Sequence, residues 1–208
     1  SERWLLLLLA AVQFTHILDF MIMMPLGPQL MRVMNIGPGQ FAAFVAAYSI
    51  SPGIVSLLAA PFVDRFDRKK LLLFAYAGFT LGTLTCALAQ NAATLLVGRA
   101  VSGAFGGIAM ATVLAIVGDV IPAQRRAAGM GIVMTAFSVA AALGVPFGLQ
   151  LAQMFRWETP FFVLAGMASV MWTVALLKLP SIRGHLEGGR SRRAFFELLR
   201  DANAGRAL

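Results

Sequence analysis

Three polar side chains stand one helical turn apart in an otherwise apolar stretch near the start of the chain: Gln13, His16 and Asp19. Residues three apart share one face of a helix, so the three would form a polar stripe. Burial favours the neutral form of a carboxylic acid, and a nearby cation favours the charged form. The stripe therefore predicts that Asp19 and His16 form a protonatable couple; the alternative is that His16 only makes a hydrogen bond within the protein.

A cation, Arg99, lies in another long apolar stretch, and Ser102, Gly103 and Gly106 follow it on the same helical face. Small residues beside a buried arginine leave room for a substrate or for a neighbouring helix. Methionines such as Met23 add a soft, adaptable surface that suits apolar ligands, although core or lipid-facing methionines would look the same. The candidate substrate and proton-coupling site comprises Gln13, His16, Asp19, Met23, Arg99, Ser102 and Gly103.

The elements that carry these residues are membrane spans. The chain has 208 residues, of which 59% are hydrophobic and 12% charged, whereas soluble domains carry about 25% charged residues. Six segments reach the roughly 20 apolar residues that a bilayer span needs: residues 4–30, 41–63, 71–89, 94–117, 127–154 and 160–177. They must be helical, because hydrocarbon offers no partner to an unpaired backbone amide. The sequence predicts an all-α integral membrane protein, a six-helix bundle over residues 1–179 with a linker and tail over residues 180–208. That tail is either amphipathic or an ordinary flexible basic segment.

Depth in the bilayer places Asp19 beside Arg99. A charge at the bilayer centre costs at least about 2.5–3.5 kcal/mol on insertion scales, so it should face the bundle interior and find a partner. The first span runs outward with Asp19 six residues before Pro25, where we expect a bend, and the fourth runs inward with Arg99 five residues past Thr94. At about 1.5 Å per residue both fall in the outer half of the bilayer at a similar height. We expect an Asp19–Arg99 ion pair, either functional or purely structural.

The basic residues set the orientation. Fourteen of the 17 Lys and Arg residues fall before the first span, in the loops at 65–70 and 125–126, and from residue 178 onward. Only Arg32 and Arg156 lie at the opposite ends of the spans. The positive-inside rule puts both termini in the cytoplasm. An even number of spans requires the two termini to lie on the same side of the membrane, so the two inferences agree. The net charge of +8 therefore reflects topology, and we expect no nucleic acid partner.

Four motifs make the chain resemble the N-terminal half of major facilitator superfamily transporters. Residues 60–69, APFVDRFDRK, are similar to the family's Gly-x-x-x-Asp-Arg-x-Gly-Arg-Lys loop, with Ala60 and Asp67 in place of its glycines. Aspartate tolerates the left-handed backbone that glycine would provide. Residues 98–107 resemble the fourth-helix Arg-x-x-x-Gly pattern, and residues 118–129 resemble the following Asp-x-x-Pro-x-x-x-Arg-x-x-x-Gly loop. Residues 18–25 look like the first helix of bacterial drug-efflux and sugar-efflux-like members.

The fifth span carries part of a motif that the family links with antiport. It has Gly144, Pro146 and Gly148, where the family has Gly-Pro-x-x-Gly-Gly. Small residues four apart let helix backbones approach closely in a membrane, so these three are predicted to pack helices.

The resemblance implies a mechanism and a set of switch residues. It implies a 3+3 inverted repeat and two six-helix bundles that rock around a midplane site lined by the first, second, fourth and fifth helices. It also implies a cytoplasmic charge cluster that holds helix ends together in the outward-facing state, made by Asp64, Arg65, Arg68, Asp119 and Arg126.

The expected function is one half of a secondary transporter that moves small organic molecules by alternating access, as proton-coupled efflux across a bacterial-type inner membrane. Its partners would be lipid, the substrate, protons, and a second six-helix bundle from the same polypeptide or a second copy. A rival is a complete six-helix homodimer acting as transporter, scaffold or receptor. An intramembrane enzyme is disfavoured, because the spans hold one histidine and neither an HExxH nor a GxSxG motif. With one cysteine, Cys86, there is no intrachain disulfide or cysteine metal site, and we expect no cofactor.

Overall fold

The computed structural model describes residues 2–63 and 65–182, with the side chains of residues 60–63 left aside; the predicted linker and tail from residue 183 onward lie outside the described part. Its helices are α1 Glu2–Val33, α2 Pro38–Val63, α3 Arg68–Ala87, α4 Ala92–Val120, α5 Ala123–Val139, the π-helical turn Ala140–Gly144, α6 Val145–Met154 and α7 Thr159–Lys178. Within the described residues, six helical stretches are long and apolar enough to cross a membrane, with α5, the π turn and α6 forming one of them. The predicted six-span, all-α architecture is confirmed.

Short polar motifs determine where helices begin. The Asp67 carboxylate accepts a hydrogen bond from the Lys69 backbone N–H at 2.8 Å, and the Asn91 side chain accepts one from the Thr94 N–H at 2.9 Å. Each satisfies an amide that the first turn leaves without a helical partner, so Asp67 caps α3 and Asn91 caps α4. Pro160 lies in the first turn of α7, where its missing N–H costs nothing.

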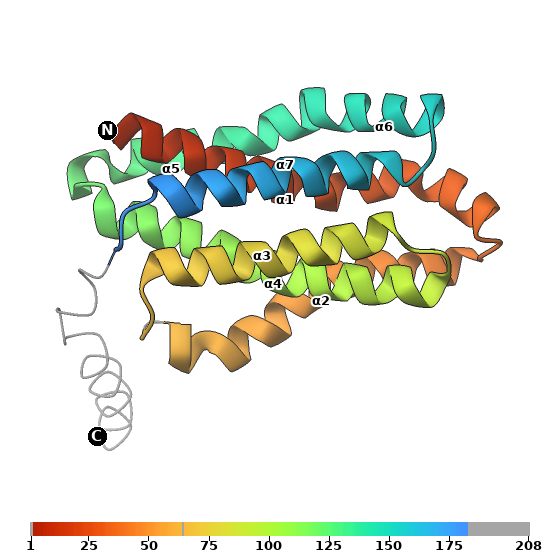
Figure 1. The fold of residues 1–208 in the computed structure, drawn as a ribbon, viewed down its shortest axis with the longest axis horizontal. Helices are drawn as coiled ribbons and strands as arrows, with labels where there is room; N and C mark the ends of the chain where they lie inside the picture. Colours follow the sequence, from red (N-terminus) through yellow and green to blue (C-terminus); the bar gives the residue numbers. More distant parts are fainter. Residues whose placement is uncertain (1, 64, 183–208) are drawn as a thin grey trace, which may run out of the picture.

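The bundle has two ends. At one end lie Glu2, the α2–α3 loop, the α4–α5 junction and residues 179–182 (Figure 1). We call this the basic end, because the charged loop and Arg125 lie there. The α1–α2, α3–α4 and α6–α7 connections lie at the far end. Both limits of the described chain are thus on one side, as six crossings require.

The fifth span departs from α-helical geometry just before Pro146. The Val145 N–H bonds to the Ala140 carbonyl, five residues back, which is the π-helical pattern. A proline inside an α-helix removes a hydrogen bond and its ring clashes with the carbonyl four residues earlier. A π turn changes the local register and is a common way to absorb such a disruption. In contrast, α1 stays α-helical through Pro25 and Pro28.

Two apolar clusters form the core, with polar side chains at their junction. Along α1, the cluster nearer the basic end takes residues up to Val12, and the cluster nearer the far end begins at Leu18. Gln13, Thr15 and His16 lie between them, and all three are buried. The polar stripe therefore falls midway along the bundle, between the two apolar clusters.

Glycines let the central helix α4 approach its neighbours. A Cβ on Gly103 would lie 2.5 Å from the Tyr48 carbonyl oxygen of α2, and one on Gly82 would lie 2.5 Å from the Ser102 amide nitrogen. Helices in lipid associate through such close backbone packing rather than through the hydrophobic effect. α4 is thereby held tightly against both α2 and α3.

Candidate functional site

Asp19 of α1 and Arg99 of α4 form a fully buried ion pair. The Arg99 Nη1 lies 3.0 Å from the Asp19 Oδ2, and the same nitrogen donates to the Asp19 backbone carbonyl at 3.1 Å. Both side chains are 0% exposed. The juxtaposition agrees with the similar heights that the sequence predicts for the two residues. Thr83 of α3 adds a longer contact from its hydroxyl to the Asp19 Oδ1, at 3.5 Å.

His16 is held by α2 rather than by Asp19. Its Nδ1 lies 2.8 Å from the Tyr48 hydroxyl, which also lies 3.1 Å from the His16 backbone carbonyl. The edge of the His16 ring meets Phe79, and Gly106 of α4 leaves the space that the ring occupies. The imidazole is therefore fixed by partners on α2, α3 and α4, one turn away from the acid with which it was expected to act.

Tyr48 is the site residue that the sequence analysis missed. Its ring centroid lies 4.0 Å from the Cζ of Arg99, and its hydroxyl contacts His16. A guanidinium over an aromatic face is attracted by the ring quadrupole. One signal was available: Tyr48 is one of two tyrosines in the chain and lies inside an apolar span.

Some polar groups of the site lack a protein partner. Gln13 is 0% exposed, and both of its amide atoms are without a hydrogen bond within residues 2–63 and 65–182. The same is true of the Nε and Nη2 atoms of Arg99. Buried polar groups are nearly always satisfied, so such atoms mark where a ligand, water or further protein would bind.

The remaining predicted site residues serve packing. Met23 is fully buried in the core nearer the far end. The Ser102 hydroxyl bonds to the Arg99 carbonyl of its own helix at 3.3 Å, while its backbone lies against Gly82. Gly103 lies against α2. The small residues beside Arg99 could leave room either for a substrate or for a neighbouring helix. In the structure, the neighbouring helices α2 and α3 pack against them.

The fifth-span glycines face α1. A Cβ on Gly144 would lie 2.9 Å from Leu18, and one on Gly148 would lie 2.6 Å from Ile22. With Pro146 placed between them and the π turn before it, this segment brings the fifth span against the helix that carries Asp19.

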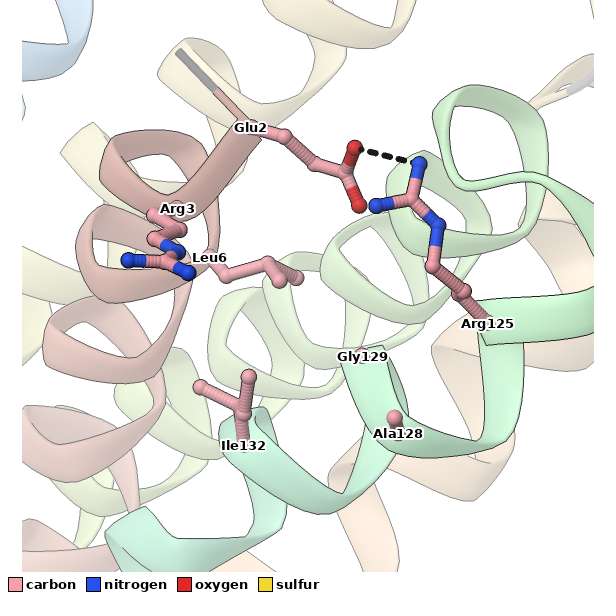
Figure 2. A pocket seen from close by; sticks show the side chains of 7 residues that line it. All are labelled: Glu2, Arg3, Leu6, Arg125, Ala128, Gly129 and Ile132. Carbon is pink, nitrogen blue, oxygen red and sulfur yellow. Dashed lines mark hydrogen bonds and ion pairs between the residues drawn. The ribbon is translucent and has the colours of Figure 1, made fainter.

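At the basic end, the predicted switch residues are partly brought together. The Nε of Arg68 lies 3.0 Å from the Oδ2 of Asp119, which links the start of α3 to the last turn of α4. Arg65 and Arg126 are exposed, and Asp64 lies outside the described residues. Arg125, next to Arg126, instead pairs with Glu2 at 3.0 Å (Figure 2).

Asp67 does not adopt the left-handed backbone that a glycine at this position would allow. Its φ is −55° and its ψ is 127°, an extended conformation that any residue adopts. The carboxylate instead accepts hydrogen bonds from the Lys69 N–H, the Ser181 hydroxyl and the Ile182 N–H. The Arg68 N–H returns a bond to the Ile182 carbonyl at 3.2 Å. Asp67 therefore attaches the segment after α7 to the α2–α3 loop.

A cavity of about 410 Å³ lies away from the ion pair, between the ends of α1 and α5 at the basic end. Figure 2 shows Glu2 reaching across it to Arg125, with Leu6 and Ile132 below. It does not include any member of the candidate coupling site.

Comparison with known proteins identifies the family. The profile of the Major Facilitator Superfamily matches residues 9–205. The uncharacterized MFS-type transporter YceJ of Bacillus subtilis is 28% identical over 83% of this chain and 44% of that protein. The gallate transporter of Pseudomonas putida is 31% identical over 69% of this chain and 32% of that protein.

Solved structures show the same fold. The crystal structure of the peptide transporter POT superposes with a TM-score of 0.75 at 17% identity, covering 86% of this chain and 39% of that one. The chain spans less than half the length of these relatives and corresponds to their N-terminal six-helix half. A superfamily of transporters, not enzymes, accounts for the motifs, the spans and the buried ion pair together, and the chain belongs to the major facilitator superfamily.

Proposed function

We propose that this chain is the N-terminal half of a proton-coupled efflux transporter for small organic molecules, and that Asp19 is its proton-binding carboxylate. The observation that carries the proposal is the Asp19–Arg99 pair, fully buried on helices that are 80 positions apart in sequence. An ionisable residue within the membrane is costly, so its presence is by default functional.

Opposed influences act on Asp19. Burial favours its neutral, protonated form, while the Arg99 guanidinium at 3.0 Å favours its charged form. A conformational change or a bound substrate that alters the contact with Arg99 therefore changes proton occupancy. That dependence is what couples a proton gradient to alternating access.

The lengths of the relatives support a second bundle on the same polypeptide, since YceJ is more than twice as long as the matched segment. A homodimer of six-helix chains is the alternative. In either arrangement the second bundle would face the exposed apolar surfaces of α2 and of the fifth span. We place the basic end in the cytoplasm of a bacterial-type inner membrane, where the Arg68–Asp119 pair would hold helix ends in the outward-facing state.

The test uses everted inner-membrane vesicles from an efflux-deficient strain that expresses the full-length protein. Vesicles energised by respiration should accumulate ethidium or Hoechst 33342, and Asp19→Asn should reduce this accumulation to the level of vesicles without the protein. Protein level and detergent-extracted monodispersity control for folding. Respiration-driven accumulation that is unchanged in Asp19→Asn refutes the coupling role.

A further inference from the structure

The Tyr48 side chain contacts two groups of the candidate site, the Arg99 guanidinium and the His16 imidazole. Its ring lies 4.0 Å from the Cζ of Arg99, and its hydroxyl lies 2.8 Å from the Nδ1 of His16. The side chain is 3% exposed, and its backbone carbonyl is pressed against Gly103 of α4. Tyr48 therefore cannot move away from Arg99 unless α2 itself moves relative to α4.

Arg99 depends on this ring because it has few acceptors. A guanidinium carries five N–H donors, yet only Nη1 reaches an acceptor, and that nitrogen serves both the carboxylate and the carbonyl of Asp19. Nε and Nη2 have none within the described ranges 2–63 and 65–182. The aromatic face supplies negative potential where hydrogen-bond acceptors are lacking, and its effect is largest when the cation is desolvated, as here.

α2 is the least buried of the spans in the described chain, and its exposed face is the one proposed above to meet the second bundle. Only 11% of its most apolar stretch is buried inside the bundle, against 61% for α1. Its tight contact with α4 at Gly103 and Gly107 is the place from which Tyr48 projects. A shift of α2 would thus change the surroundings of Arg99, and it would also move Phe44, the α2 residue in the core nearer the far end.

We propose that Tyr48 is a positioning residue whose ring holds the Arg99 guanidinium on Asp19, so that the position of α2 controls proton binding at Asp19. This inference rests on the coupling role proposed above. When α2 and its ring move away, the guanidinium shifts toward other acceptors and Asp19 takes up a proton. When α2 returns, the pair re-forms and the proton leaves.

The other groups that face the pair are few. His16 is on α1 with Asp19, Thr83 and the Cys86 thiol approach from α3, and Tyr48 approaches from α2. His16 is the titratable group that the Tyr48 hydroxyl also contacts. His16→Asn should therefore be combined with each Tyr48 variant to separate the two sites.

The experiment compares Tyr48→Phe, which keeps the ring, with Tyr48→Leu, which removes it. Tyr48→Met serves as a second variant without the ring if Tyr48→Leu does not fold. The matched controls are Tyr76→Phe and Tyr76→Leu, because Tyr76 is also buried and its hydroxyl also contacts α1, at Thr15. All variants are made in the full-length protein.

Two readouts are needed. The first is the ratio of proton-driven ethidium transport to ethidium counterflow, which requires no net proton movement. The second is the NMR signal of the Arg99 Nε–H in arginine-labelled protein, assigned by its absence in Arg99→Lys, which carries an upfield ring-current shift if the aromatic face is in place.

Positioning by the ring predicts that Tyr48→Phe keeps the shift, and that its transport ratio falls less than that of Tyr48→Leu, because it loses only the hydroxyl contacts with His16 and Asp19. Tyr48→Leu should lose the shift and lower the ratio about tenfold, the equivalent of one modest buried cation–π contact. Both Tyr76 variants should keep the wild-type ratio. Equal defects in Tyr48→Phe and Tyr48→Leu, or a ratio in Tyr48→Leu that matches Tyr76→Leu, overturn the proposal. If Asp19→Asn still shows proton-driven transport, the proposed function fails, and the Arg99 shift alone then decides whether Tyr48 positions the guanidinium.

Discussion

Removing both members of the buried ion pair should destabilise the protein by clearly less than the sum of the losses from removing each member alone. Asp19→Asn leaves the Arg99 charge at a site with 0% exposure. With 3.0 Å between Nη1 and Oδ2, the direct attraction is about 5–6 kcal/mol at an effective dielectric constant of about 20. That attraction is lost while the cost of desolvating the guanidinium remains. We therefore expect Asp19→Asn to lower the free energy of unfolding by about 3–5 kcal/mol.

The companion variant Arg99→Gln leaves the Asp19 carboxylate buried without its cation. Asp19 can take up a proton, which reduces the cost of burying it without a partner. The double variant buries two neutral amides, which can bond to each other across the same gap. Its loss of stability should be smaller than the sum of the two single losses by about 2 kcal/mol or more, because residues in direct contact are not additive.

The assay is titration of the purified protein with sodium dodecyl sulfate in mixed micelles, followed by the fluorescence of its three tryptophans. The matched control is the Glu2–Arg125 pair, which has the same 3.0 Å separation but side chains 34% and 62% exposed. Solvent screening should reduce the coupling of that pair to about 0–1 kcal/mol.

Additive effects of Asp19→Asn and Arg99→Gln, within about 0.5 kcal/mol, would refute the buried pair. So would equal coupling in the exposed control. A double variant that recovers stability but not proton-driven transport would separate the functional interpretation from the purely structural one, since a structural pair needs only to be neutralised.

The remaining predictions concern packing and the basic end. Gly103→Ala, whose Cβ would meet an α2 carbonyl oxygen at 2.5 Å, should cost about 1–3 kcal/mol in the same titration, whereas Gly131→Ala, with no neighbouring atom within 4 Å, should be neutral or stabilising by up to about 1 kcal/mol. Arg68→Ala should cost about 1.5–3 kcal/mol by removing a charged hydrogen bond to Asp119, and exchanging the two charges should recover part of that loss. Asp67→Gly, which restores the family residue, should speed amide exchange in residues 179–182 by about tenfold or more, measured by hydrogen-exchange mass spectrometry; unchanged exchange would mean that the carboxylate does not hold this segment.

The similar heights of Asp19 and Arg99 along the bundle could be predicted from the sequence, but lateral contacts could not. A helix rises by a fixed amount per residue, so the heights of Asp19 and Arg99 follow from their distances to the ends of their spans. Which neighbour lies beside them depends on helix rotation and packing order, which hydropathy does not encode. Tyr48 was missed for that reason, and the sequence could not choose between a substrate and a neighbouring helix beside the small residues that follow Arg99.

Tertiary contacts decide the conformation of Asp67. This residue occupies a glycine position of the family's loop, and aspartate tolerates the left-handed backbone that glycine would provide. In the structure it is extended, and its carboxylate accepts bonds from the start of α3 and from the segment after α7. The residue across that contact, Ser181, is more than 100 positions away, so a motif read locally could not reveal it.

The arrangement of α2 explains how a sealed site can still respond to conformation. The Asp19–Arg99 pair has no exposure, yet one of its neighbours, the Tyr48 ring, belongs to the span with the least burial in the described chain. α4 packs closely on α2 at Gly103 and Gly107, so the Tyr48 ring follows any movement of α2 relative to α4. A movement of α2 relative to α4 would therefore change the electrostatics at Asp19. The ion pair can then remain buried in both states, because what changes is the partner of the guanidinium and not its exposure to water.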